Sequence, residues 1–146
     1  MVYKNLSVCY NDFVGRIDNM KTKFFICKIC GNEEVMINFS GVTPVCCGQE
    51  MTELIANKDE TASKEKHIPV VTIVGKHVEV VVGSVIHPML PAHYIKWIYM
   101  ETTKGGQLKK LQPDNEPKAS FVLENEELVA VYEYCNLHGL WVKEIK

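Results

Sequence analysis

The sequence predicts an all-β protein in which a small cysteine-rich domain precedes an antiparallel β-sandwich. Two observations favour the sandwich: short runs of β-branched residues dominate from residue 67 onward, and turn signals separate these runs at regular spacing. That pattern is typical of packed antiparallel sheets and not of alternating strands and helices. A third observation, two pairs of cysteines further upstream, indicates the smaller domain. The 146 residues suffice for one sizeable core and a satellite domain that a metal would stabilise.

The strands of the sandwich are expected to begin with a hairpin. Ile68–Val74 and Val78–Ile86 are rich in β-branched residues and flank the turn signal Gly75-Lys76. Turn-forming residues at 105–106, 113–115 and 124–126 separate the later runs. These later strands are expected over Tyr94–Met100, Ser120–Leu123, Leu128–Tyr134 and Leu140–Ile145.

Composition and domain organisation limit the classes of function that this chain can have. The polar segment Asn57–Ala62 lacks a periodic apolar face, so we place the domain junction there. The formal net charge of −2, without a basic stripe, argues against a nucleic-acid partner. The opening residues contain no apolar run long enough for an export signal or a membrane span, so we expect a cytoplasmic protein without a membrane partner.

The first cluster of candidate ligands is Cys27-x2-Cys30 followed, after fifteen residues, by Cys46-Cys47. Two thiolate pairs suit a tetrahedral site for zinc or a single iron, and a purely structural zinc ribbon fits the spacing equally well. Adjacent residues on a regular strand point to opposite faces, so Cys46 and Cys47 require a bent backbone to bind one ion. A disulfide between these two is an alternative, but it demands strained geometry and leaves Cys27 and Cys30 unexplained.

The second cluster contains four of the five histidines and one cysteine: His67, His87, His93, Cys135 and His138. Five nitrogen and sulfur donors exceed what tetrahedral zinc normally uses, whereas a redox-active iron accepts all five and keeps one position open. Several of these residues stand where expected strands meet loops, which is where convergent ligands are usually carried. The remaining histidine, His77, lies beside the expected hairpin turn, and we expect it to be exposed and unligated.

Three motifs in these clusters resemble one family. Glu65-Lys66-His67-x-Pro69, His87-Pro88-Met89-x3-His93-Tyr94-Ile95 and Cys135-Asn136-x-His138-Gly139, together with the cysteine spacing, resemble desulfoferrodoxin, the two-iron form of superoxide reductase, from about Met20 onward. The resemblance implies an extension over 1–19, a desulforedoxin-like iron domain over 20–57 and an immunoglobulin-like catalytic sandwich over 58–146. It implies two non-haem irons per chain, one bound by the four cysteines 27, 30, 46 and 47, the other by His67, His87, His93 and His138 with Cys135 axial.

The same resemblance implies an activity, partners and roles for two further residues. The reaction would be one-electron reduction of superoxide to hydrogen peroxide without release of oxygen, with rubredoxin or a similar small iron protein as electron donor and a homodimer as assembly. Lys66 would attract superoxide and organise water for protonation, and Glu65 would occupy the open position of the ferric iron after the product leaves. Taken alone, Glu65 and Lys66 are a solvated pair in a lysine-rich loop.

Competing classes remain open at this stage. A zinc-stabilised sandwich that binds metal without turnover, or a pure electron carrier, would use the same ligands. A zinc hydrolase is disfavoured, because such sites usually keep three protein ligands and a positioned base. Residues 1–19 lie outside the resemblance. We interpret them as a mobile arm or the product of an upstream start, with a short segment packed on the first domain as the alternative.

Overall fold

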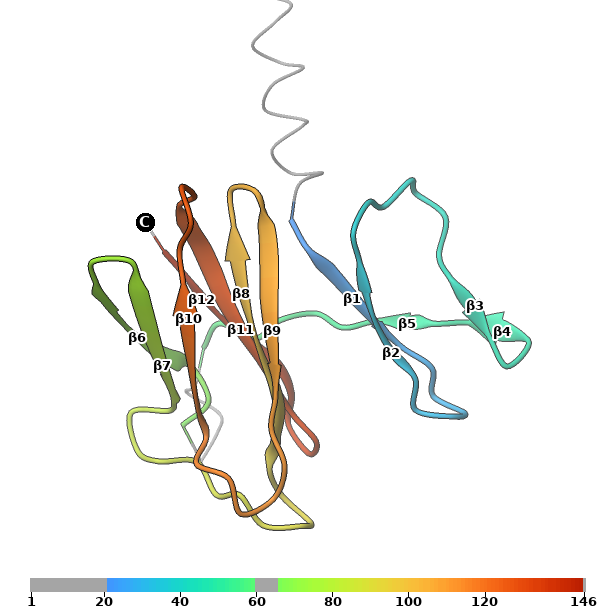
Figure 1. The fold of residues 1–146 in the computed structure, drawn as a ribbon. Coiled ribbons are helices and arrows are strands. Elements are labelled where there is room, and N and C mark those ends of the chain that lie inside the picture. The colour runs from blue at the N-terminus through green and yellow to red at the C-terminus, as the bar shows by residue number, and fades with distance from the viewer. Residues whose placement is uncertain (1–20, 60–65, 146) are drawn as a thin grey trace, which may run out of the picture. The chain divides into compact units, whose positions relative to one another are not determined.

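The computed structural model describes residues 21–59 and 66–145, and the chain divides into two compact units, Met1–Leu54 and Ile55–Lys146 (Figure 1). Every regular element in the described ranges is a β-strand, which confirms the predicted all-β class. The domain bounds at residues 19 and 57 stay predictions, and the extension 1–19 lies outside the described residues. None of the described residues forms a helix long and apolar enough to cross a lipid bilayer.

The first unit is built from five short strands around a small core. They are β1 (Lys23–Ile26), β2 (Glu33–Met36), β3 (Val45–Cys46), β4 (Gln49–Glu50) and β5 (Thr52–Glu53). One sheet has the order β2-β1-β5, and β3 pairs with β4 in a two-stranded ribbon. The buried core consists of Phe25, Cys27 and Met51, with Met36, Phe39 and Cys46 packed against it. So small a core leaves much of this unit's order to other interactions.

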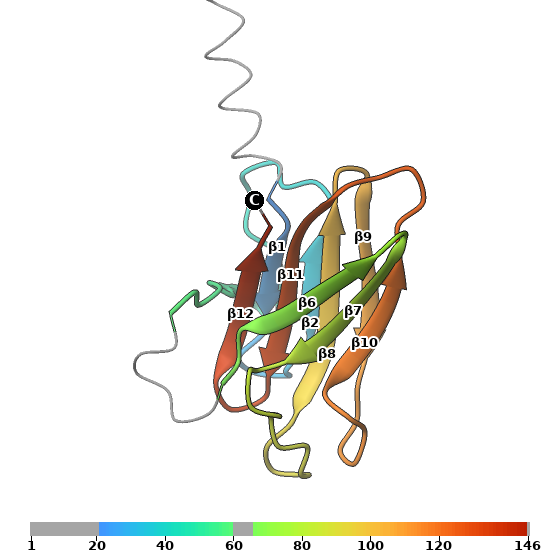
Figure 2. The same ribbon diagram turned by 90° about the vertical axis from the view of Figure 1, so that its left-hand side faces the viewer.

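The second unit is a sandwich of two antiparallel sheets, seen face on in Figure 2. The three-stranded sheet has the order β10-β7-β6, and the four-stranded sheet has the order β12-β11-β8-β9. The strands are β6 (Pro69–Val74), β7 (His77–Val82), β8 (Ile95–Thr102), β9 (Gly105–Lys110), β10 (Lys118–Val122), β11 (Leu128–Cys135) and β12 (Gly139–Glu144). These elements confirm the predicted sandwich, including its first hairpin.

Alternation along the strands produces the sandwich core. In β7, Val78, Val80 and Val82 are buried while the residues between them are exposed. They pack with Phe121 of β10 and, from the other sheet, with Ile98, Met100 and Val131. Cys135 belongs to the same core, at the last position of β11. The core therefore reaches one of the candidate metal ligands directly.

Two predicted details of the sandwich are wrong. The second hairpin strand ends at Val82 and not at Ile86, because Gly83 adopts a left-handed φ of 81° that turns the chain. Gly105-Gly106 was expected to lie in a turn, but both residues begin β9. The sequence of β9 contains no β-branched residue, so its strand structure depends on pairing with β8.

Strand register brings the loops that carry the second cluster to one end of each sheet. In the hairpin, Pro69 at the start of β6 pairs with Val82 at the end of β7. In the other sheet, Cys135 at the end of β11 pairs with Ile95 at the start of β8 and with Gly139 at the start of β12. His67, His93 and His138 lie within two residues of these paired ends in the sequence, and His87 follows Val82 by five residues.

Candidate metal centres

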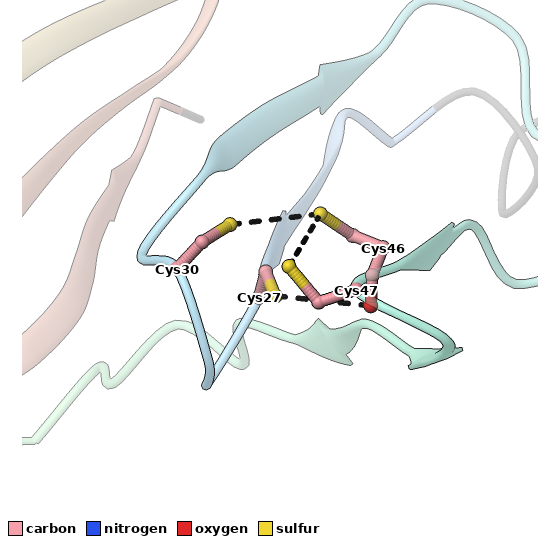
Figure 3. Close-up of side chains that lie close together, drawn as sticks. All are labelled: Cys27, Cys30, Cys46 and Cys47. Carbon is pink, nitrogen blue, oxygen red and sulfur yellow. Dashed lines mark hydrogen bonds between the residues drawn. The ribbon is translucent and has the colours of Figure 1, made fainter.

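The four cysteines of the first unit converge in space (Figure 3). All four sulfur atoms lie within 4.8 Å of one another. Cys46 Sγ is 3.6 Å from Cys30 Sγ and 3.9 Å from Cys47 Sγ. Metal–sulfur bonds of about 2.3 Å in a tetrahedron place sulfurs about 3.8 Å apart, so the cluster fits one zinc or iron ion. The 3.9 Å separation is about twice a disulfide bond, which rules out the Cys46–Cys47 disulfide.

Two backbone turns produce this convergence. The first is a knuckle in which Cys27 N donates to Asn32 O and Gly31 N donates to Cys27 O, with Gly31 at a φ of 78°. In the second turn, Cys47 adopts a φ of 52°, which is rare for a residue with a side chain. This is the bend that two adjacent cysteines were expected to need. Its local cost, on the order of 1 kcal/mol, indicates that something stabilises the turn.

The surroundings of Cys27, Cys46 and Cys47 make the pKa values of these three thiols differ. Hydrogen bonds from the backbone N–H groups of Cys30 and Ile29 lower the pKa of Cys27 to about 6. Contacts with the sulfurs of Cys30 and Cys27 raise the pKa of Cys46 to about 12, and the Cys30 contact also raises the pKa of Cys47. Four thiolates this close repel one another, so full ionisation of the cluster requires a bound cation.

Four histidines of the second unit form a closed square of imidazole rings. Neighbouring ring centroids are 4.7 Å apart for His67–His87, 4.6 Å for His87–His93, 4.9 Å for His93–His138 and 4.9 Å for His138–His67. Successive rings are tilted by 57–82° against one another, so no neighbouring pair around the square is stacked face to face. Three segments that are distant in the sequence, one of which carries both His87 and His93, thus surround one point.

Cys135 brings a sulfur to this square from the core side. Donor atoms of His67, His87, Cys135 and His138 all lie within 4.8 Å of one another, and Cys135 Sγ is 3.8 Å from His138 Nδ1. His93 contributes the fourth ring, although its donor atom is outside that tightest group. Cys135 and His67 are fully buried, whereas His138 is exposed. A donor set of imidazoles and one thiolate suits iron, copper or zinc.

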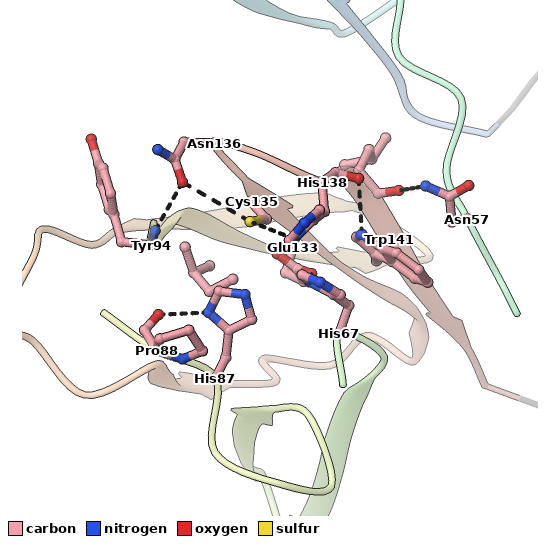
Figure 4. Close-up of polar contacts among 12 residues, drawn as sticks. Asn57, His67, His87, Pro88, Tyr94, Glu133, Cys135, Asn136, His138 and Trp141 are labelled. Atoms are coloured by element: carbon pink, nitrogen blue, oxygen red, sulfur yellow. Dashed lines mark hydrogen bonds and ion pairs between the residues drawn. The ribbon is translucent and has the colours of Figure 1, made fainter. Parts of the chain in front are cut away.

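Outer contacts orient two of the imidazoles (Figure 4). His87 Nδ1 lies 2.6 Å from the Pro88 carbonyl oxygen, which can only accept a hydrogen bond, so this nitrogen carries the proton. His67 Nδ1 lies 3.2 Å from Oε1 of the fully buried Glu133. Both arrangements leave Nε2 for a metal, and the Nε2 atoms of His67 and His87 are buried.

Sequence reasoning missed Glu133 and Trp141 as site residues. Trp141 stacks on His67, with centroids 4.6 Å apart and planes 10° from parallel, and its Nε1 donates to His138 O at 3.2 Å. Glu133 stands among apolar and aromatic residues two positions before Cys135. This pattern could have predicted a buried carboxylate that orients a metal ligand. No feature of the sequence indicated that Trp141 would be a site residue.

Asn136 ties two of the ligand loops together. Its Oδ1 accepts from Tyr94 N at 2.8 Å, and its Nδ2 donates to Ala92 O at 3.0 Å. The loop carrying His93 is thereby fixed to the loop carrying Cys135. Asn136 was quoted in the sequence only as part of a motif, and its two hydrogen bonds explain why an amide side chain suits this position.

Of the two candidate residues that precede His67, the structure describes only the second. Glu65 lies outside the described residues, while Lys66 is half-buried immediately before His67. The close approach of Gly83 helps to locate Lys66, because a Cβ at Gly83 would lie only 2.2 Å from the Lys66 carbonyl oxygen. His77 is exposed on β7, as expected.

Comparison with known proteins agrees with this geometry. The desulfoferrodoxin family model matches residues 59–144, and the model of the desulfoferrodoxin N-terminal domain matches residues 20–54. A desulfoferrodoxin homolog of Archaeoglobus fulgidus is 43% identical over 115 residues, covering 79% of this chain and 90% of that protein. A desulfoferrodoxin of Clostridium acetobutylicum is 36% identical over 127 residues, covering 87% of this chain and 99% of that protein.

Among solved structures, the superoxide reductase from Treponema pallidum superposes with a TM-score of 0.71 at 38% identity, covering 85% of this chain and 98% of that one. The sequence likeness therefore extends through both units and both clusters of ligands. On these matches, the chain belongs to the desulfoferrodoxin family.

Proposed function

We propose that this protein is a superoxide reductase that holds two non-haem irons, one in each candidate centre. The observation that carries the proposal is the closed square of His67, His87, His93 and His138 with the Cys135 sulfur beside it. Five protein donors in this arrangement leave one position of an octahedral ion for substrate, which suits iron and exceeds the usual requirement of zinc.

Iron bound in the square would supply the single electron that converts superoxide, after uptake of two protons, to hydrogen peroxide. Cys135 approaches the square from the sandwich core and would hold the iron together with the imidazoles. Its thiolate would donate electron density to the iron, as a thiolate does in thiolate-ligated haem. The neutral imidazoles favour the ferrous state that must give up the electron.

Lys66 and Glu65 are proposed to act on the substrate and on the position where it binds. The Lys66 ammonium, one residue from His67, attracts the superoxide anion and organises water that donates protons. Glu65 is proposed to occupy the open position of the ferric site once the peroxide has left. The Gly83 backbone lies close to Lys66 O and thereby restrains the main chain of Lys66. This restraint supports the proposal that Lys66 attracts superoxide.

The cysteine cluster is proposed to hold the second iron. Its four donors complete a tetrahedron and leave no position for substrate, so this ion transfers electrons or stabilises the first unit. Each reduction of superoxide oxidises the catalytic site, and we propose rubredoxin or a similar small iron protein as the donor that restores it. A homodimer in a reducing cytoplasm is the proposed assembly and compartment.

Metal analysis of the protein isolated from its native source is the first test. Two irons per chain with thiolate-to-iron absorption are expected. Stoichiometric zinc without iron would overturn the proposal in favour of a zinc-stabilised binding module. An electron carrier would contain iron but would not react with superoxide.

Pulse radiolysis of the reduced protein is the second test, because it generates superoxide directly. Each superoxide consumed should oxidise one catalytic iron and yield one hydrogen peroxide, with no oxygen evolved. Dismutation would release oxygen and produce half as much peroxide, and this result would contradict the proposed reaction. Oxidation of reduced rubredoxin that depends on both superoxide and this protein would test the donor.

A further inference from the structure

Trp141 contacts two of the candidate ligand residues at once, His67 through its ring and His138 through its backbone carbonyl. Its ring lies parallel to His67 at a centroid separation of 4.6 Å and an angle of 10°, so it covers one face of that imidazole. The same indole donates its Nε1–H to His138 O at 3.2 Å. One side chain thus links a residue before β6 to a residue in the β11–β12 turn (Figure 4).

The strand register adds a second restraint on His67. Trp141 of β12 stands directly opposite Glu133 of β11, so the two side chains share one face of the sheet. Glu133 Oε1 lies 3.2 Å from His67 Nδ1, while Trp141 covers the ring face. The carboxylate restricts rotation within the ring plane, and the indole restricts the tilt of that plane.

Trp141 is itself held firmly, because Asn57 pairs with the backbone on both sides of it. Asn57 N donates to Leu140 O at 2.8 Å, and Val142 N donates to Asn57 O at 3.0 Å. Asn57 Nδ2 adds a bond to Leu140 O at 3.1 Å. These bonds protect the edge of β12, and only 6% of Trp141 is exposed.

We propose that Trp141 is a positioning residue that orients His67 and His138 before metal binds. The inference rests on the ligand set of the proposed function. Ligand rings that are already restrained lose less conformational freedom when they coordinate an ion, which raises affinity and fixes the ligand geometry. Trp141 touches neither the ion nor the substrate in this role.

Three full-chain variants test the proposal. Trp141→Leu removes both the stacking and the N–H donor, and Trp141→Phe removes the donor while keeping an aromatic ring. Trp97→Phe is the matched control, since Trp97 is the other tryptophan of the chain and is similarly buried. Its ring stacks on Tyr134 with a centroid separation of 5.5 Å and an interplanar angle of 13°. The tetrathiolate centre in the same molecule serves as an internal reference.

Two quantities should be measured: the affinity of the square for ferrous iron in competition with a chelator, and the absorption and electron paramagnetic resonance of the ferric site. Loss of an outer contact to a metal ligand typically weakens affinity by about 10–100-fold. Trp141→Leu should fall in that range and shift the ferric spectra, Trp141→Phe should show a smaller effect, and Trp97→Phe should stay within about twofold of the parent.

Equal affinities and unchanged spectra in the Trp141 variants would overturn the inference, as would an equal loss in Trp97→Phe. If Trp141→Leu fails to fold, Trp141→Phe decides the matter by the same two measurements. Because affinity is measured without superoxide, a parent protein that binds iron but does not reduce superoxide would contradict the proposed function while leaving this inference supported.

Discussion

The two candidate metal centres use opposite strategies to hold their donors. In the first unit, Cys30 and Cys47 are exposed, and the sulfurs converge through two tight backbone turns around a core of three buried residues. In the second unit, the donors stand at the end of a sandwich, where Glu133, Trp141 and Asn136 restrain the ligands and their loops. One centre is organised by the chain's turns, the other by its tertiary packing.

That difference agrees with the roles proposed for the two centres, a structural or electron-transfer site in the first unit and a reactive site in the second. A saturated tetrahedral site needs only that four sulfurs reach the ion, and the ion in return holds the turns together. A reactive site must keep an open position, so the protein has to maintain ligand geometry that the metal alone would not impose. The buried outer contacts are therefore expected around the imidazole square.

The strongest test of this separation exchanges one cysteine in each centre for serine. Cys135→Ser should abolish superoxide reduction while the tetrathiolate spectrum persists. Cys46→Ser should abolish or weaken the tetrathiolate spectrum while superoxide reduction survives. Pulse radiolysis and visible spectra of both variants provide the check. Loss of the catalytic iron in a folded Cys46→Ser protein would show that the two centres are interdependent.

Removal of both metals should affect the two units unequally. The first unit, with its small core and mutually repelling thiols, should lose most of its amide protection, whereas the sandwich should keep the protection of β7, β8 and β11. Hydrogen exchange on metal-free and metal-loaded protein measures this. Equal amide protection of both units after chelation would contradict the idea that bound metal is needed to order the first unit but not the sandwich.

Glu133→Gln should weaken iron binding by the square roughly tenfold, because the amide is a poorer partner for His67 Nδ1 than a carboxylate. The buried Glu101 offers a control. It accepts a hydrogen bond from the Tyr132 hydroxyl at 3.1 Å, and burial together with this carboxylate raises the pKa of Tyr132. Glu101→Gln should leave iron affinity unaltered. A matching loss in both variants would assign the effect to general destabilisation.

An effect of similar size is expected on the rate of encounter with superoxide. Lys66→Ala should slow the second-order reaction of the ferrous protein roughly tenfold with iron content unchanged, the scale of modest electrostatic steering. Rising ionic strength should slow the parent more than this variant, since salt screens charges over about 8 Å. Pulse radiolysis across a salt series measures both quantities.

Lys76→Ala is the matched control for this experiment. Lys76 follows the far end of β6, and a strand of that length spans about 20 Å at roughly 3.3 Å per residue, beyond the screening length. The control should react at the parent rate with the parent salt slope. Equal rate constants and slopes for the parent and Lys66→Ala would identify Lys66 as an ordinary solvated charge.

By itself, the amino-acid sequence determined the donor types, the two-cluster organisation and most of the sandwich strands. These features are local: thiol and imidazole chemistry belongs to the residue, and β-branched runs between turn signals favour strands wherever they occur. Even the need for a bend at Cys46-Cys47 followed from the period of a strand, and the left-handed φ of Cys47 meets it.

Only the tertiary structure decided how the donors of the second centre are arranged and supported. The imidazole square depends on pairings such as Pro69 with Val82 and Cys135 with Ile95, which bring distant loops together. The opposition of Glu133 and Trp141 next to His67 depends on the register of β11 with β12, and a slip of one residue would place the two side chains on opposite faces of the sheet. Strand β9 likewise owes its conformation to its partner, because its own residues have little preference for a strand. Contacts of this kind arise from long-range packing, which local sequence preferences do not specify.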